Sequence, residues 1–335
     1  MERRMATMAV VAIATVLGVA GLASRVTAAA RPAERVTVML EWSPNTNHTG
    51  LYVALDKGWY RDQGLDVQIV EPGEGVSVES VVGAGRADFG FSAQEFMTYA
   101  RLQGVPVVSV AAVLQHNTSG FASMAGARIR RPKDFEGKRY GGFGLPIERA
   151  VLSSLMRCDG GDPEKLQLVS IGVGDLLSHL ERGNVDLAWI FYGWQGIEAK
   201  LRGLDIDVVM MDRYAGCVPD YYTPVIITSE SLIRQRPELV RRFVEATARG
   251  YAWSIEHPDE AAGILVRRVP ELDPRLVRES QRWLSPRYRA EAPRWGEQKL
   301  EVWQRLADWL LEHGLVKGRL DAASAFTNRF LPAPR

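Results

Sequence analysis

Five short segments of the chain place aromatic side chains close to carboxylates or amides. A flat aromatic face binds planar heterocycles by stacking. A carboxylate can accept hydrogen bonds from an exocyclic amine and a protonated ring nitrogen together. The combination suits a ligand with an amino-substituted aromatic ring, although any one of these aromatics could instead pack in the core. The candidate residues are Trp42, Asn45, Glu95, Glu148, Tyr192, Trp194, Glu198 and Tyr222.

A glycine turn could bind an anion through its backbone N–H groups. Gly142 and Gly144 follow an expected strand and precede a helix that could begin at Pro146. The turn lacks the third glycine and the acidic partner of a dinucleotide site, so a plain tight turn is an equal alternative. No nucleophile elbow, zinc-protease motif or phosphate-binding loop occurs, and the five histidines have no metal-ligand spacing. We therefore expect no catalytic residues, no metal and no cofactor.

These residues follow the strands of an expected α/β fold. Apolar, β-branched runs alternate with helical patterns, which predicts helices packed on a mostly parallel sheet. In such sheets ligand sites form at the carboxyl ends of strands, where several of the five segments fall. We expect strands at 36–40, 67–70, 87–91, 107–114, 139–141, 168–171, 187–191, 208–211 and 224–228.

The C-terminal part of the chain is expected to be helical. No repeat, low-complexity tract or Gly/Ser linker separates it from the strands before it. Two α/β segments followed by a helical tail fit lobes built from discontinuous chain, with a ligand cleft between them. The helices expected there are 237–254, 258–268, 274–284 and 294–312.

Length and composition fit a globular protein of one or two domains. The 335 residues are 46% apolar and 24% charged, which excludes a disordered chain, a collagen and a multi-span membrane protein. The 41 Lys and Arg nearly balance the 40 Asp and Glu. No basic field is available to attract a phosphate backbone, so we expect no nucleic acid partner.

The N-terminus has the pattern of an export signal. Arg3 and Arg4 precede an uncharged apolar stretch at 5–24, and three alanines at 28–30 offer a cleavage site. We expect residues 1–30 to be removed. An uncleaved anchor is the alternative, since about 20 apolar residues can span a bilayer. No cysteine lies near the cleavage site, so we expect a soluble periplasmic protein without a lipid anchor.

The chain has two cysteines, Cys158 and Cys217. They are too few for a disulfide framework or for a zinc site of their own. We interpret them as two buried thiols. Pairing with each other after export is the alternative, which spacing alone does not decide.

Several motifs resemble the periplasmic-binding-protein family that includes bacterial formylaminopyrimidine-binding proteins and the fungal thiamine-pyrimidine synthases. The resemblance spans about residues 35–331. It is carried by EWSPNTNHTGLYVALDKGWY (41–60), QHNTSGFAS (115–123), KDFEGKRYGGFGLPIE (133–148), WIFYGWQGIEAKLRG (189–203), DYYTPVIIT (220–228) and APRWGEQKLEVW (292–303).

The resemblance implies a type II periplasmic-binding-protein fold, with two α/β lobes joined by a two-strand hinge. We place one lobe at 35–120 plus 225–335 and the other at 121–224, with crossings near 118–123 and 222–227. The bacterial members deliver pyrimidine thiamine precursors to the permease and ATPase subunits of an ABC transporter. We expect the same role here, for a monomer.

The resemblance also implies roles for individual residues. Trp42, Tyr192 and Tyr222 would stack on the ring or border it. The main-chain turn at Gly142–Gly144 would face a substituent or a formyl group. The implied polar contacts are Asn45, Glu95, Glu148 and Glu198.

The chain departs from the fungal enzymes at their chemistry. Those enzymes carry a lysine for pyridoxal phosphate and a histidine consumed as substrate, whereas GFSAQEFMTY (90–99) has Ser92 and Phe96 there. Their cysteine-rich iron motif is replaced by CVPDYYT (217–223). Without a Schiff-base lysine that chemistry cannot proceed, so we predict a binder. A riboflavin-binding receptor is the alternative, and a pyrimidine synthase is the less favoured third hypothesis.

Overall fold

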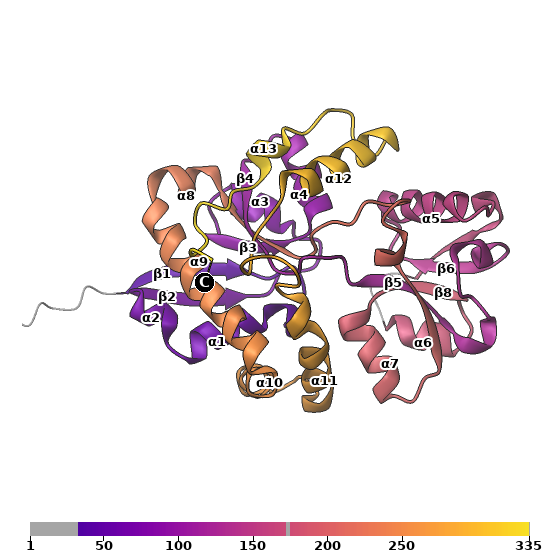
Figure 1. The fold of residues 1–335 in the computed structure, drawn as a ribbon, viewed down its shortest axis with the longest axis horizontal. Helices are drawn as coiled ribbons and strands as arrows, with labels where there is room; N and C mark the ends of the chain where they lie inside the picture. The colour runs from indigo at the N-terminus through magenta and orange to yellow at the C-terminus, as the bar shows by residue number, and fades with distance from the viewer. Residues whose placement is uncertain (1–32, 172–174, 335) are drawn as a thin grey trace, which may run out of the picture. The chain divides into compact units, whose positions relative to one another are not determined.

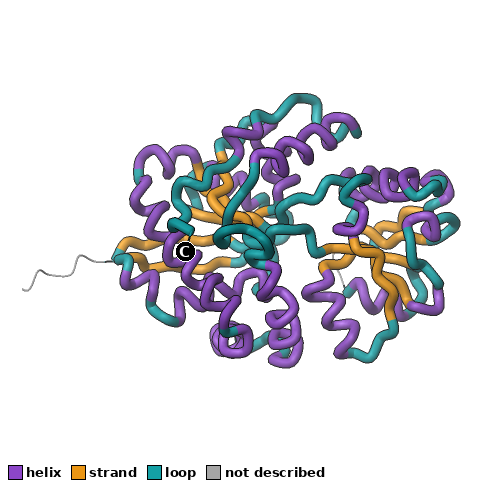
Figure 2. Tube along the Cα trace, in the orientation of Figure 1, coloured by secondary structure: helices purple, strands orange, loops and turns teal. Residues whose placement is uncertain are grey.

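Residues 33–171 and 175–334 are described by the computed structural model. They form two five-stranded sheets with helices packed against them (Figures 1 and 2). The first sheet has the order β2-β1-β3-β10-β4, and the second has the order β7-β6-β8-β5-β9. The expected export signal, residues 1–30, lies outside the described ranges. No helix within those ranges is long and apolar enough to cross a membrane.

The strands are β1 (Glu34–Met39), β2 (Leu65–Val70), β3 (Phe89–Ser92), β4 (Val107–Ala112), β5 (Ser119–Met124), β6 (Arg139–Gly142), β7 (Gln167–Ser170), β8 (Leu187–Phe191), β9 (Ile206–Met210) and β10 (Val225–Ser229). The helices are α1 (Thr49–Asp56), α2 (Trp59–Asp62), α3 (Val78–Gly83), α4 (Gln94–Leu102), α5 (Pro146–Cys158), α6 (Leu176–Glu181), α7 (Ile197–Leu201), α8 (Glu230–Gln235), α9 (Pro237–Glu256), α10 (Pro258–Arg268), α11 (Pro274–Leu284), α12 (Leu300–Glu312) and α13 (Ala322–Ala325). Short helical turns near the site are η1 (Thr46–His48), η5 (Tyr192–Gly196), η6 (Met211–Tyr214) and η7 (Ser285–Arg287).

Each sheet contains one strand that runs against its neighbours, and that strand follows a passage of the chain between the sheets. In the first sheet β10 is antiparallel to β3 and β4, and in the second β5 is antiparallel to β8 and β9. The chain passes to the second sheet through residues 113–118 and returns through 211–224. The predicted α/β fold with two lobes and two connecting segments is therefore confirmed.

Alternating side chains divide the apolar residues of each strand between two faces of the sheet. In β10, Ile226 joins the cluster formed with α1 and α9, whereas Val225 and Ile227 join the cluster formed with α3, α4 and α12. In β5, Phe121 packs with α5 and Ala122 packs with α6. This period of two buries both faces of each sheet.

Prolines and one aspartate fix where the long helices begin. Pro146, Pro237, Pro258 and Pro274 lie in the first turns of α5, α9, α10 and α11. A proline there has a suitable φ, and its missing N–H leaves no helical hydrogen bond unmade. Asp273 also caps α11, because its carboxylate accepts from two backbone N–H groups of the first turn.

The expected mostly parallel arrangement is confirmed, since one strand in each sheet is antiparallel to its neighbours. Two other expectations from the sequence are corrected. The sequence does not predict β5, whose residues SGFASM are small and weakly patterned. The last long helix begins at Leu300, because residues 294–299 run beside the first sheet, where Gly296 bridges to Ala112.

Cys158 and Cys217 form a disulfide with their Cα atoms 5.8 Å apart. The interpretation of two separate thiols is therefore wrong. Cys158 ends α5, and Cys217 lies in the returning passage 211–224. The bond therefore fixes that passage to the end of α5, a helix that packs on the second sheet.

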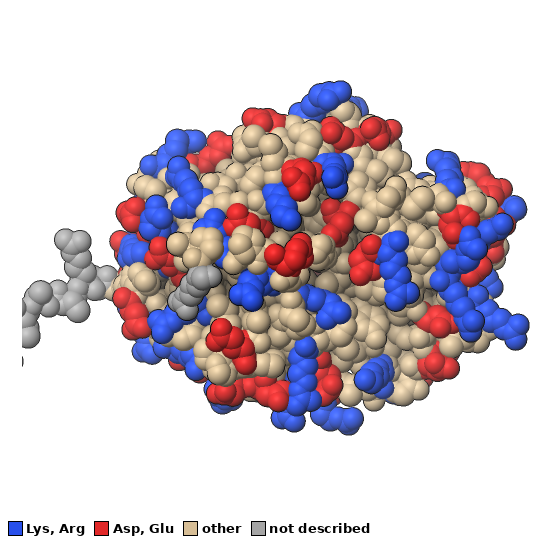
Figure 3. Space-filling view, in the orientation of Figure 1, with Lys and Arg blue, Asp and Glu red and all other residues tan. Residues whose placement is uncertain are grey.

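Charged side chains of both signs are interspersed on the face shown in Figure 3. Many form local ion pairs, such as Arg139 with Asp186 at 2.8 Å and Arg282 with Asp259 at 2.7 Å. This mixture agrees with the near-zero net charge of the sequence.

Candidate functional site

The loop after β1 carries Trp42 and Asn45, which have different environments. The side chain of Asn45 is buried, accepts a hydrogen bond from Asn47 N at 2.8 Å and donates to Ser43 O at 3.0 Å. It therefore caps η1 and holds the loop in shape. Trp42 is 45% exposed, so its indole has a free face on which a planar ring could stack.

Glu95 lies in the first turn of α4, the helix that follows β3. Glu95 is buried, and its Oε2 atom has no hydrogen-bond partner. Burial raises the pKa of Glu95 to about 7, and the nearby carboxylate of Glu79 adds to the effect. Glu79 itself is held by the hydroxyls of Ser77 and Ser92. Glu95 is therefore a buried acid whose Oε2 atom can still accept a hydrogen bond.

The glycine turn after β6 is filled by the protein's own carboxylate. Glu148 is buried, and its two oxygens accept hydrogen bonds from Phe143 N at 3.0 Å and Gly144 N at 3.1 Å. Gly144 has a φ of 82°, which glycine adopts without strain. Gly142 lies against Glu148, where a Cβ atom would overlap the carboxylate. The turn thus binds an anion, and that anion is Glu148.

The segment after β8 carries Tyr192, Trp194 and Glu198, whose side chains lie in three different environments. The ring of Tyr192 lies 5.1 Å from that of Trp283 on α11. Trp194 packs on an apolar cluster between α1, α10 and α11. Glu198 forms an ion pair with Arg202 one turn later at 3.3 Å. Of the three, Tyr192 lines the cavity described below.

Tyr222 is buried and hydrogen-bonds to two other segments of the chain. Its hydroxyl accepts a hydrogen bond from Lys299 N at 3.0 Å, and its own backbone N–H donates to Gln94 Oε1 at 2.9 Å. Burial raises its pKa to about 12. These contacts join the returning passage to the start of α4 and to the segment before α12.

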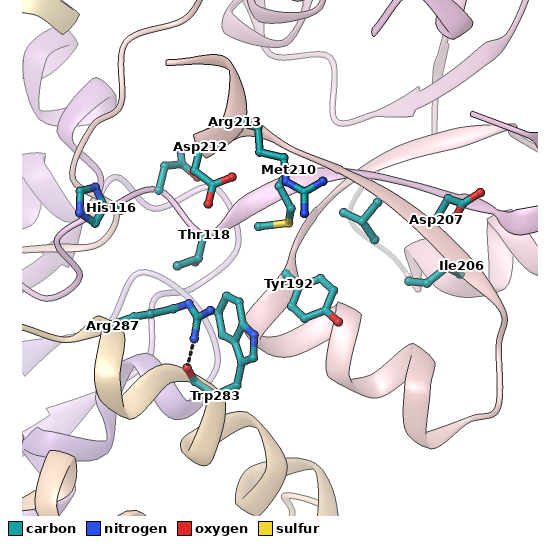
Figure 4. A pocket seen from close by; sticks show the side chains of 12 residues that line it. His116, Thr118, Tyr192, Ile206, Asp207, Met210, Asp212, Arg213, Trp283 and Arg287 are labelled. Carbon is teal, nitrogen blue, oxygen red and sulfur yellow. Dashed lines mark hydrogen bonds between the residues drawn. The ribbon is translucent and has the colours of Figure 1, made fainter. Parts of the chain in front are cut away.

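A cavity of about 490 Å³ lies where the two passages meet β9, η5 and α11 (Figure 4). Tyr192 and Trp283 form one aromatic side, and the Arg287 guanidinium lies 3.6 Å from the centre of the Trp283 ring. Burial lowers the pKa of Arg287. Tyr192 is the one predicted site residue among those that line it. The others are His116, Asn117, Thr118, Ile206, Asp207, Val208, Met210, Asp212, Arg213, Trp283 and Arg287.

Sequence reasoning missed most of the residues around this cavity. His116, Asn117 and Thr118 do lie in the QHNTSG motif, which could have marked them. Trp283 and Arg287 carry no such signal, because their helical region has the pattern of ordinary amphipathic packing. Among the described residues, no group of three or more His, Cys, Asp or Glu side chains could hold a metal ion.

Comparison with known proteins gives a consistent family. The family described as "NMT1/THI5 like" matches residues 45–261. A formylaminopyrimidine-binding protein of Halalkalibacterium halodurans is 30% identical over 88% of this chain and 90% of its own length. A 4-amino-5-hydroxymethyl-2-methylpyrimidine phosphate synthase of Legionella pneumophila is 27% identical over 89% of this chain and 92% of its own. The riboflavin-binding protein RibY of Chloroflexus aurantiacus is 27% identical over 89% of this chain and 86% of its own length.

The solved structures support the same architecture. The periplasmic aliphatic sulphonate binding protein SsuA of Escherichia coli superposes with a TM-score of 0.68, over 90% of this chain and 93% of its own. The sequence identity is 15%, so this likeness concerns the fold. The described part of this chain has the two-lobed fold of the periplasmic binding proteins.

Proposed function

The chain belongs to the NMT1/THI5-like family, and on that premise we propose that it is the solute-binding receptor of an ABC importer for a pyrimidine thiamine precursor. The ligand would be of the formylaminopyrimidine or hydroxymethylpyrimidine type, taken up for thiamine biosynthesis. The observation that carries the proposal is the similarity to a formylaminopyrimidine-binding protein over 88% of the chain. The binding-protein fold supports it.

The chemistry of the site agrees with a small aminopyrimidine. Trp42 and Tyr192 offer aromatic faces that a pyrimidine ring can stack on. Glu95 offers a buried carboxylate oxygen that can accept from an amine. Glu148, Glu198, Trp194 and Tyr222 already have partners within the protein, so we assign them to shaping the site. Asn45 and the Gly142–Gly144 turn belong to the same supporting group.

We extend the proposal to closure of the lobes. Residues 35–120 with 225–335 would move as one lobe and 121–224 as the other, about the two passages between the sheets. The closed form would be presented to a permease and its ATPase, by a monomer with no nucleic acid partner. The Cys158–Cys217 disulfide supports export to the periplasm, since such bonds persist in oxidising compartments.

A synthase activity is disfavoured by the residues around Glu95. Ser92 donates its hydroxyl hydrogen bond to Glu79, and Phe96 is 40% exposed. Neither can form a Schiff base with pyridoxal phosphate. The similarity to a named synthase of Legionella pneumophila keeps this activity as an outcome for the assay below.

Riboflavin is the second candidate ligand, because RibY is 27% identical over 89% of this chain. An isoalloxazine ring would also stack on Trp42 or Tyr192. The two ligands differ in colour, which makes the alternatives easy to separate.

The test is mass spectrometry of the ligand released by denaturing residues 31–335 purified from the native host. A released aminopyrimidine supports the proposal, and a released flavin supports the alternative. If the cleft is empty, titration calorimetry with both compounds follows. Failure of the folded protein to bind an aminopyrimidine at millimolar concentration would reject the proposal, and turnover with pyridoxal phosphate, iron and oxygen would replace it with an enzyme.

A further inference from the structure

Trp283 and Arg287 line the cavity drawn in Figure 4, although neither is among the site residues predicted from the sequence. We propose that Arg287, assisted by Arg213, binds an anionic substituent, a carboxylate or a phosphate ester, on a planar ring that enters this cavity. The inference rests on the proposed function and goes further, because it assigns a negative charge to the ligand and names the residues that select for it.

The guanidinium of Arg287 is held in place by contacts within the protein. It lies 3.6 Å from the centre of the Trp283 ring, and its Nη1 atom donates a hydrogen bond to Trp283 O at 2.5 Å. The carbonyl oxygen of Arg287 accepts a hydrogen bond from Gln115 N, in the first passage, at 3.4 Å. Because the side chain is already ordered, a ligand that binds to it loses little affinity to ordering it.

Most of the hydrogen-bonding capacity of Arg287 is unused. A guanidinium has five N–H donors in a planar fork, and the side-chain hydrogen bond of Arg287 goes to a neutral carbonyl. Within the described residues no ion pair joins it to a carboxylate, and burial lowers its pKa because the charge has lost part of its hydration. A partly buried cation without an anionic partner is unfavourable. An anion that enters the cavity removes this cost, since the fork matches a carboxylate or a phosphate.

Two other charged groups that line the cavity are already balanced by neighbours. The carboxylate of Asp207 lies 3.8 Å from the guanidinium of Arg130. His116 bonds to Glu291 and to a second carboxylate, and Lys299 lies 3.9 Å from Glu291, so two cations face two carboxylates there. Neither group therefore supplies an unbalanced charge to a ligand.

The remaining charged residues of the lining are Asp212, Arg213 and Arg287. Asp212 and Arg213 lie on η6 in the returning passage, whereas Arg287 ends η7. Together they give two cations against one carboxylate, so the lining has an excess of positive charge that favours an anion. Arg213 is exposed, and its long side chain can add a second guanidinium to an anion that Arg287 holds.

The aromatic side of the cavity indicates which kind of molecule carries the anion. The ring of Tyr192 lies 5.1 Å from that of Trp283, and Figure 4 shows the indole between the guanidinium of Arg287 and the phenol. A planar ring that packs against this aromatic pair places a substituent within reach of Arg287. The volume of about 490 Å³ suits a small ring with such a substituent. The ligand class is therefore a heteroaromatic acid or phosphate ester.

The test is titration calorimetry with three ligands that share one ring: 4-amino-5-hydroxymethyl-2-methylpyrimidine, its phosphate ester, and 4-amino-2-methylpyrimidine-5-carboxylate. We expect the unmodified protein to bind at least one of the two anions about tenfold or more tightly than the alcohol. The ratio between the two anions then distinguishes a carboxylate site from a phosphate site.

Three variants assign the preference to the arginines. Arg287→Gln, which removes the charge, should bring the anions and the alcohol within about threefold of each other. Arg287→Lys, which keeps the charge without the planar fork, should retain part of the preference. Arg213→Gln should weaken the anions about threefold and leave the alcohol unchanged, because this guanidinium is exposed and screened.

Arg289→Gln is the matched control, because Arg289 is exposed and is not among the residues that line the cavity. It should leave all three affinities unchanged. Circular dichroism establishes that each variant is folded, and if Arg287→Gln is not, Arg287→Lys and Arg213→Gln decide. An alcohol bound as tightly as both anions, or a preference unchanged in the deciding variants, overturns the inference and leaves the proposed function standing. Absence of binding of all three ligands overturns both.

Discussion

His116 and Asp220 are 104 residues apart in the sequence, yet their side chains share a hydrogen bond between Nδ1 and a carboxylate oxygen. The other ring nitrogen of His116 bonds to Glu291 at 2.9 Å. A carboxylate only accepts, so both ring nitrogens must carry protons and His116 must be an imidazolium. His116 and Asp220 belong to the two passages between the sheets, and Glu291 follows η7. One cation therefore joins three segments beside the candidate site.

This arrangement predicts a loss of stability at alkaline pH. The hydrogen bond to Asp220, with the bond to Glu291 and both charges, raises the pKa of His116 to about 9. A raised histidine pKa gives stability that is fully present below its unfolded value of about 6.5 and is lost as the pH rises through about 9. The ring is about half exposed, so we expect a change of about 1 kcal/mol after solvent screening.

The measurement is urea unfolding of the unmodified protein and of His116→Gln between pH 6 and pH 10. The two curves should converge at the alkaline end. The carboxylates bonded to His116 are Asp220 and Glu291, and Lys299 lies 3.9 Å from Glu291. Asp212, Arg213 and Arg287 line the same cavity as His116. A difference between the two proteins that is constant with pH would contradict the imidazolium assignment.

The Cys158–Cys217 disulfide predicts a redox-dependent stability. Its cysteines are 59 residues apart, and in the chain-entropy model a cross-link closing a loop of this size stabilises a protein by about 4 kcal/mol, mainly by restricting the unfolded chain. Dithiothreitol should therefore lower the midpoint of urea unfolding. The double variant Cys158→Ser/Cys217→Ser should unfold at that lower midpoint with or without the reductant. Finding two free thiols in the protein purified without a reductant would refute the bond.

Helices α1 and α9 cross at two glycines, and this contact predicts a sensitive position. A Cβ atom on Gly250 would overlap the backbone oxygen of Gly50, which cannot move without shifting α1. We expect Gly250→Ala to destabilise the protein by about 3 kcal/mol or more, in the manner of overpacked cores. Gly263→Ala in α10 is the control, because the nearest neighbour of its Cβ is the end of the Arg267 side chain, and alanine should stabilise that helix by about 0.5 to 1 kcal/mol. Equal effects on the melting temperature would show that the helix crossing has been misjudged.

The sequence was most informative where local signals and burial agree. Prolines at the helix starts and a clear amphipathic period predict α10 and α11 with the boundaries that the structure has. The strand β5 escapes prediction because it is made by its pairing with β8 and β9, which a weak local pattern does not reveal. The start of α12 is displaced because Gly296 pairs with Ala112, a contact between residues far apart in the chain.

In the candidate site, too, some features follow from local sequence and others depend on contacts that the sequence does not reveal. The residue types at strand ends predict a ligand site, and of the predicted residues Tyr192 lines the cavity. What they cannot indicate is which groups the protein itself uses. Glu148 and Glu95 look alike in sequence, yet one fills a turn and the other lacks a partner. Trp194 likewise resembles Trp42 but packs into a core cluster.

The contrast between the two tryptophans gives the last prediction. Trp42 is 45% exposed, so Trp42→Ala should leave the free energy of unfolding within about 0.5 kcal/mol of the parent. Loss of a stacked ring should weaken ligand binding by about 1 to 2 kcal/mol, which is roughly a fivefold to thirtyfold change in Kd. Trp194→Ala should do the reverse, since its ring packs among helices: it should lower stability by about 2 kcal/mol or more and change affinity less. Calorimetric titration and urea unfolding of both variants decide the matter. If Trp42→Ala binds as tightly as the parent while Trp194→Ala does not, the ring of the ligand stacks elsewhere than on the loop after β1.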